Sequence, residues 1–94
     1  MKKDPFLRSL VNNIIEKLEE KGLEIVDYWD ADLCAIGLKK KGESKRLVYV
    51  SSYGKSPEYF CLEFEEIDRC SFQVVNRYEN VHETDILEKV AEFF

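Results

Sequence analysis

The apolar positions of residues 4–22 follow a helical period. Asp4 precedes Pro5, which is a common start signal because an acidic residue and a proline suit the first turn of a helix. Apolar residues then recur every three or four positions and form one stripe: Phe6, Leu7, Leu10, Val11, Ile14, Ile15 and Leu18. Lys21-Gly22 ends the segment, because glycine adopts the left-handed conformation that closes many helices. The pattern predicts an amphipathic N-terminal helix.

Segments rich in β-branched and aromatic residues follow, separated by short runs of turn-forming residues. They predict four strands at Leu23–Trp29, Leu33–Lys40, Lys45–Tyr53 and Glu58–Glu65, and a less regular fifth at Phe72–Tyr78. The connections are too short for crossover helices, so neighbouring strands are expected to be antiparallel. A final apolar stripe, preceded by His82 as a cap and by an acidic turn, predicts a C-terminal helix through Ile86, Leu87, Val90, Phe93 and Phe94.

These elements predict one α+β domain over residues 1–94. Its antiparallel sheet has four to five strands, and both helices bury their stripes on one face of it. With 45% hydrophobic residues, the 94-residue chain can build a core without a metal or a disulfide. No apolar run approaches the roughly 20 residues of a membrane helix or resembles a signal peptide, which indicates a cytoplasmic protein. Cys34, Cys61 and Cys70 are odd in number and lack C-x-x-C spacing, which predicts buried, reduced thiols.

Strand alternation also predicts a register for the third and fourth strands. Pairing Val50 with Leu62 and Val48 with Phe64 keeps the apolar residues of both strands on the helix-covered face. The same register places three further pairs on the outer face: Tyr49 with Glu63, Leu47 with Glu65, and Tyr53 with Tyr59. This face fits a recognition surface with an aromatic centre and an anionic rim. Cross-strand aromatic pairs that merely stabilise an exposed sheet would give the same pattern.

The charge is divided unevenly along the chain. Residues 1–57 hold nine acidic and eleven basic side chains, whereas residues 58–94 hold ten acidic and three basic, so their net charges are +2 and −7. Carboxylates concentrated on one part of a surface favour a basic partner. The candidate acids are Glu63, Glu65, Glu66 and Asp68, with Tyr49, Tyr53 and Tyr59 as packing anchors. Asp30 and Asp32, in a turn beside Trp29, form a second candidate patch, and simple solvation of the acids is the alternative.

The sequence contains no catalytic or metal-binding motif. Glu63 and Glu65 would lie about 7 Å apart on one strand face, within the range of a carboxylate pair, but an open sheet face neither excludes water nor raises a pKa. The single histidine, His82, has no serine or cysteine nucleophile placed beside it by a known motif. With one histidine and three dispersed cysteines, the chain has too few ligands for a structural zinc site. Its dispersed glycines form no phosphate-binding loop. We therefore predict a non-catalytic protein without a cofactor or metal.

Nucleic acid is a poor match for this chain. Basic residues flank one predicted hairpin and could lie beside Tyr49 and Tyr53: Lys39, Lys40, Lys41, Lys45 and Arg46. However, the net charge is −5, and repulsion from phosphates would oppose binding. Lysines at a hairpin also protect a sheet edge from aggregation. The predicted partner is a protein.

The element order, the length and three segments resemble the small immunity proteins of bacterial polymorphic toxin systems, including those of contact-dependent growth inhibition. The segments are the helix ending at Lys21-Gly22, the strand Arg46–Ser51, and the helix opening at Val81–Leu87. His82 departs from that pattern, in which serine or aspartate is usual at the cap. The resemblance implies a protein without catalysis of its own that covers the active site of a cognate toxin domain, often a nuclease.

A basic nuclease needs a positive surface, which an acidic inhibitor can approach rapidly and occupy. This agrees with the charge of residues 58–94. The alternative is a general protein-interaction or small regulatory module, including a homodimer joined through the sheet face or an edge strand. The sequence pattern is compatible with a monomer and with a dimer.

Overall fold

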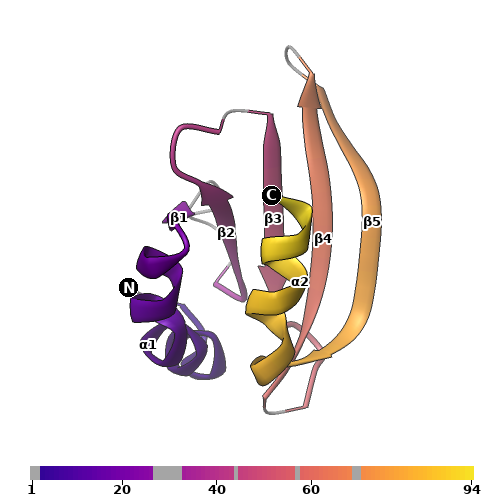
Figure 1. Cartoon of the computed structure of the whole chain (residues 1–94). Helices are drawn as coiled ribbons and strands as arrows, with labels where there is room; N and C mark the ends of the chain where they lie inside the picture. The colour runs from indigo at the N-terminus through magenta and orange to yellow at the C-terminus, as the bar shows by residue number, and fades with distance from the viewer. Residues whose placement is uncertain (1–2, 27–32, 44, 57, 69–70) are drawn as a thin grey trace.

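A computed structural model describes residues 3–26, 33–43, 45–56, 58–68 and 71–94. These residues form two helices, a short 3₁₀ turn (Glu83–Asp85) and five strands: α1 (Pro5–Glu20), β1 (Leu23–Val26), β2 (Ala35–Lys40), β3 (Arg46–Ser51), β4 (Tyr59–Asp68), β5 (Ser71–His82) and α2 (Ile86–Phe93). The strands form one antiparallel sheet in the order β1-β2-β3-β4-β5, so every strand pairs with its neighbour in sequence. The predicted α+β class is confirmed (Figure 1).

Both helices pack on one face of the sheet, which we call the inner face. A single core joins the stripe of α1, the stripe of α2 and the alternate residues of β2, β3 and β4. Leu7 and Leu10 of α1, Leu62 of β4, and Ile86 and Val90 of α2 are all fully buried in this core. Figure 1 shows α2 crossing the inner face over β3 and β4, where the Phe93 ring lies 5.0 Å from that of Phe64.

The ends of the helices follow their sequence signals in part. Pro5 stands in the first turn of α1, and Gly22 follows the helix with a φ of 71°, the left-handed conformation expected of a closing glycine. The Asp4 side chain makes no capping hydrogen bond to α1, and its carboxylate accepts one from the Ser52 hydroxyl at 2.9 Å. His82 caps the 3₁₀ turn that leads into α2 and not α2 itself: its Nδ1 accepts the Thr84 N–H at 3.2 Å, and Asp85 stands at the N-cap of α2.

The predicted register of β3 and β4 is confirmed. Val50 lies opposite Leu62 and Val48 opposite Phe64, while Tyr49 faces Glu63 and Leu47 faces Glu65. The ladder ends at the Ser51–Cys61 pair, so the predicted pairing of Tyr53 with Tyr59 is wrong. Tyr53 lies instead in the turn that follows β3.

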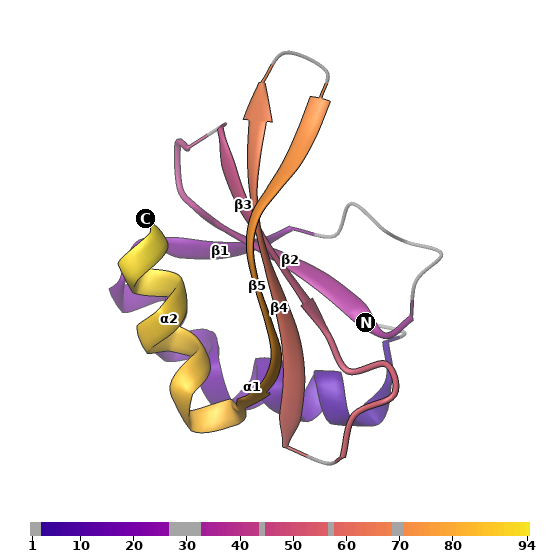
Figure 2. The same ribbon diagram turned by 90° about the vertical axis from the view of Figure 1, so that its right-hand side faces the viewer.

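The last two strands are longer than the sequence predicted. β4 continues to Asp68, so the residues after Glu65 belong to a strand and not to a loop. β5 begins at Ser71 and extends over twelve residues, which confirms a fifth strand and lengthens it. Seen from the side, the far ends of β4 and β5 extend beyond the other strands (Figure 2). Neither helix of the described chain is long and apolar enough to cross a membrane.

Candidate partner-binding surface

In the part of the chain that the structure describes, no helix lies on the outer face of the sheet (Figure 1). Cross-strand pairing aligns one row of residues across all five strands of this face: Val26, Gly37, Tyr49, Glu63 and Arg77. Gly37 is close to its neighbours, since a Cβ atom there would lie 3.0 Å from the Val26 Cγ2 atom and 3.2 Å from the Leu47 Cδ1 atom. The absence of a side chain at Gly37 therefore leaves room for the Val26 and Leu47 side chains above β2.

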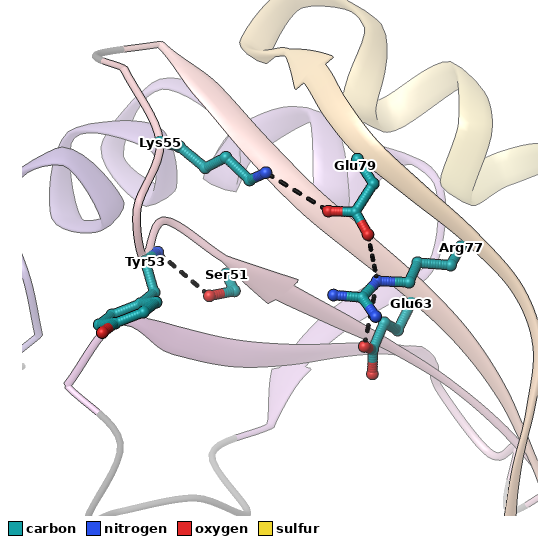
Figure 3. Close-up of polar contacts among 6 residues, drawn as sticks. All are labelled: Ser51, Tyr53, Lys55, Glu63, Arg77 and Glu79. Carbon is teal, nitrogen blue, oxygen red and sulfur yellow. Dashed lines mark hydrogen bonds and ion pairs between the residues drawn. The ribbon is translucent and has the colours of Figure 1, made fainter.

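A hollow of about 480 Å³ lies over the β3, β4 and β5 part of this face. Aromatic, polar and charged residues line it together: Tyr49, Ser51, Tyr53, Lys55, Cys61, Glu63, Arg77 and Glu79. They come from three adjacent strands and from the turn after β3, whose position is fixed in part by the Tyr53 N–H donating to the Ser51 hydroxyl at 3.2 Å. Figure 3 shows six of these residues around the hollow.

Ion pairs connect the charged residues of the hollow. The Arg77 Nε atom lies 2.9 Å from a Glu79 oxygen and 3.5 Å from a Glu63 oxygen (Figure 3). The Lys55 Nζ atom lies 3.5 Å from the other Glu79 oxygen. The two cations balance the two carboxylates, so this part of the outer face is not the unpaired anionic surface that the charge of residues 58–94 predicted.

Arg77 is the centre of this network. A hydrogen bond with the Cys61 thiol, followed by attraction to Glu79, raises the pKa of Arg77 above its ordinary value. Cys61 is buried, as predicted, whereas Cys34 is only half-buried, and both are reduced. The guanidinium thus contacts Glu63, Glu79 and Cys61 together, which gives the hollow charges of both signs.

Glu65 occupies a different environment from Glu63, although both lie on the outer face of β4. It stands opposite Leu47 on one side and Val74 on the other, and only 8% of it is exposed. Burial, followed by repulsion from Glu63, raises the pKa of the Glu65 carboxyl. Leu47 is 1% exposed, so this end of the outer face is more buried than the sequence predicted. Glu65 is therefore not a freely exposed rim carboxylate.

The other two candidate acids of β4 lie on the opposite side of the strand. Because side chains alternate between the faces, Glu66 and Asp68 point to the inner side, where Glu66 lies opposite Arg46. Both are exposed, because this end of β4 extends beyond the helices. The four predicted acids are thus divided between two faces and do not form one cluster. Asp30 and Asp32 lie outside the described residues.

The three candidate tyrosines are also separated. Tyr53 is 79% exposed at the rim of the hollow, and its ring points away from Arg77 (Figure 3). Tyr49 is half-buried and lines the hollow. Tyr59 is outside it, with its ring edge against the His82 ring at 5.1 Å. Two of the three predicted anchors therefore border the same site.

Sequence reasoning missed the residues that make the hollow a charged network: Lys55, Arg77 and Glu79. Arg77 and Glu79 are two residues apart, so in a strand they share one face. That spacing indicates a pair of opposite charges on one face only if residues 77–79 form a strand. The irregular alternation of this segment made the strand hard to predict. In the described part of the chain, no three His, Cys, Asp or Glu side chains are grouped as metal ligands.

The sequence matches no known protein family model and no curated protein, and the fold matches no solved structure. The geometry of this surface is therefore the basis for proposing a function.

Proposed function

We propose that this protein is a non-catalytic inhibitor that binds a cognate, basic toxin domain in the bacterial cytoplasm and covers its active or substrate-binding surface. The observation that carries the proposal is the outer face of β3, β4 and β5. Both helices lie on the inner face, which leaves the outer face open to a partner. Its hollow combines tyrosine rings with ion-paired carboxylates, a combination that suits protein recognition.

The paired carboxylates can still accept a basic partner. A carboxylate has about four acceptor sites, and the ion pairs to Arg77 and Lys55 use only part of those on Glu63 and Glu79. An incoming lysine or arginine could share these oxygens while Arg77 holds them in place. The net charge of −5 would steer a basic domain toward the protein, and the hollow would fix its orientation.

The exposed tyrosine at the rim gives the partner an apolar contact. Tyr53 buries little surface in the isolated protein, so a partner packed against its ring would gain most of that contact on binding. Tyr53 and Glu63 are thus the two residues of this face whose removal should weaken binding most.

Purification of the tagged protein from its native cells, at low and at high salt, tests the proposal. We expect a basic domain that is recovered at low salt and elutes at high salt. When it is expressed alone it should be toxic, and co-expression with this protein should restore growth. Absence of a toxic basic partner would contradict the proposal.

A matched pair of variants then tests the surface. Glu63→Gln and Glu66→Gln make the same chemical change on opposite sides of β4. We expect Glu63→Gln and Tyr53→Ala each to weaken binding of the toxin domain by about tenfold or more, and Glu66→Gln to change it little. Equal effects of Glu63→Gln and Glu66→Gln would show that net charge acts without a defined site, and no effect of either would exclude this face.

A further inference from the structure

β5 is a long edge strand. It pairs with β4 on one side, and no strand of the described chain pairs with its other side. All ten residues from 71 to 80 are exposed. Alternate residues of such a strand direct their N–H and C=O groups away from the sheet, where another strand can bind them.

Apolar side chains are concentrated on this edge. Nine large hydrophobic residues are exposed in the described chain, and four of them lie on β5: Phe72, Val74, Val75 and Tyr78. Their exposed fractions run from 36% for Tyr78 to 58% for Phe72. A long edge with exposed apolar residues favours association with a further strand.

The middle of β5 pairs regularly with β4, between two register shifts. Two register shifts place an extra residue on β5, one between Tyr78 and Val81 and one at Val75. Between them, Asn76, Arg77 and Tyr78 stay in regular register with β4. A pairing centred on Tyr78 sets this regular segment of one copy opposite residues 78–80 of the other, the part of β5 that contains the first shift.

The charges on either side of Tyr78 indicate which strand fits. We propose that a second copy of this chain pairs antiparallel with β5, with the two-fold axis at Tyr78. Arg77 of each copy then lies opposite Glu79 of the partner subunit, which gives two favourable cross-strand pairs. A two-fold axis at Arg77 would instead set two guanidinium groups opposite each other, which is unfavourable.

The intramolecular contacts of Arg77 are compatible with this pairing. Its Nε atom makes the two ion pairs to Glu63 and Glu79, whereas a guanidinium has five N–H donors. A further carboxylate can bind at its terminal nitrogens. The perpendicular two-fold axis keeps the outer faces of both copies on the same side, so the dimer would carry two open outer faces on one continuous sheet. The inference does not depend on a toxin partner.

Analytical ultracentrifugation of the purified protein tests the dimer. We expect a concentration-dependent dimer for the unmodified chain. Arg77→Glu and Glu79→Arg each make both cross-strand pairs repulsive, so each variant should dimerise about tenfold or more weakly. A chain that stays monomeric at millimolar concentration would overturn the proposal.

Mixing the two variants separates pairing from folding. In a mixed dimer, Glu at position 77 of one copy faces Arg at position 79 of the other, and the second pair is equally favourable. We expect the mixture, with one variant carrying a mass tag, to form a heterodimer although neither variant dimerises alone. Circular dichroism and thermal melting establish that each variant is folded. If two folded variants form no heterodimer, or if each still dimerises like the unmodified chain, the Tyr78-centred pairing is wrong.

Discussion

The two faces of the sheet differ in what holds their side chains in place. On the inner face, the helices cover a continuous apolar layer in which Leu38, Val50 and Leu62 are fully buried. On the outer face, one row of residues changes from apolar at Val26 to charged at Arg77, and ion pairs connect its last members. Stability should therefore depend mainly on the inner face, and recognition on the outer face.

The outer face is nevertheless not a uniformly solvated surface. Leu47, Cys61 and Glu65 all lie on it and are all buried. A sheet face without helices can still bury residues where side chains of neighbouring strands cover one another. Val26 and Leu47 do so above Gly37, which has no side chain of its own. Substitutions on both faces test this difference, and the expected loss of unfolding free energy decreases from the inner face to the outer one.

The largest effect is expected from Leu62→Ala. Leu62 is fully buried between the sheet and the helices, so its truncation removes apolar contacts and leaves a cavity. Such changes cost about 3 kcal/mol of unfolding free energy, which corresponds to a fall in Tm of roughly 12 °C or more for a domain of this size. Urea denaturation with Tyr53→Ala as the outer-face control checks this, because Tyr53 is 79% exposed and its loss should change stability by less than about 0.5 kcal/mol. Similar losses for both variants would remove the distinction between the faces.

Gly37→Ala is expected to have the next largest effect. The added methyl group would meet the Val26 carbonyl oxygen at 3.0 Å, as well as the side chains of Val26 and Leu47. Overpacking of this kind costs about 1–2 kcal/mol, and thermal unfolding measures it. Adding Val26→Ala should recover part of the loss by removing one of the three contacts. A Gly37→Ala protein as stable as the unmodified chain would mean that β1 can move away from β2 at no cost.

The sequence predicted the inner face far better than the outer one. Val48, Val50, Leu62 and Phe64 alternate strictly, and alternation has only one register that buries all four, so the β3–β4 pairing followed directly. β5 exposes nearly all its residues and contains two register shifts, so no burial pattern marks its length or phase.

The candidate site was predicted only in part for the same reason. Glu63 and Tyr49 were placed correctly on one face, since β3 and β4 position both. The pairing of Glu63 with Arg77 depends on β5, and the contact of Lys55 with Glu79 depends on the turn after β3. Summed charge along the chain cannot reveal such pairing, because a cation from another strand can neutralise an acid in space.

A smaller, pH-dependent effect is expected at Glu65. Its folded-state pKa is raised, mainly by burial and then by Glu63, so ionisation favours the unfolded chain. Above the folded-state pKa the charge therefore lowers the free energy of unfolding. This loss of stability disappears as the pH falls below the pKa of the unfolded chain, about 4.3. We expect Glu65→Gln to stabilise the protein by about 0.5 kcal/mol at pH 7 and not at pH 3.5. Unfolding curves at both pH values measure this effect, and Glu66→Gln, at an exposed neighbouring position, is the control. A loss of stability in Glu65→Gln at pH 7 would instead mean that contacts in the folded protein favour the charged carboxylate.

An effect as small as that at Glu65 is expected from the ion pairs of the hollow. A double-mutant cycle with Lys55→Ala and Glu79→Ala measures the coupling free energy of this ion pair, whose atoms lie 3.5 Å apart. The pair of Lys39 on β2 with Glu24 on β1, at 3.4 Å, is the matched control outside the hollow. Exposed pairs contribute about 0.2–1 kcal/mol and weaken with salt, so we expect the two couplings to be similar and both to decrease in high salt. A coupling well above 1 kcal/mol for Lys55 and Glu79 would instead show that the network stabilises the fold, and a partner could then use its carboxylates only by disrupting a structural element. A weak coupling leaves these charges able to exchange partners at little cost, as recognition of a basic protein on the outer face requires.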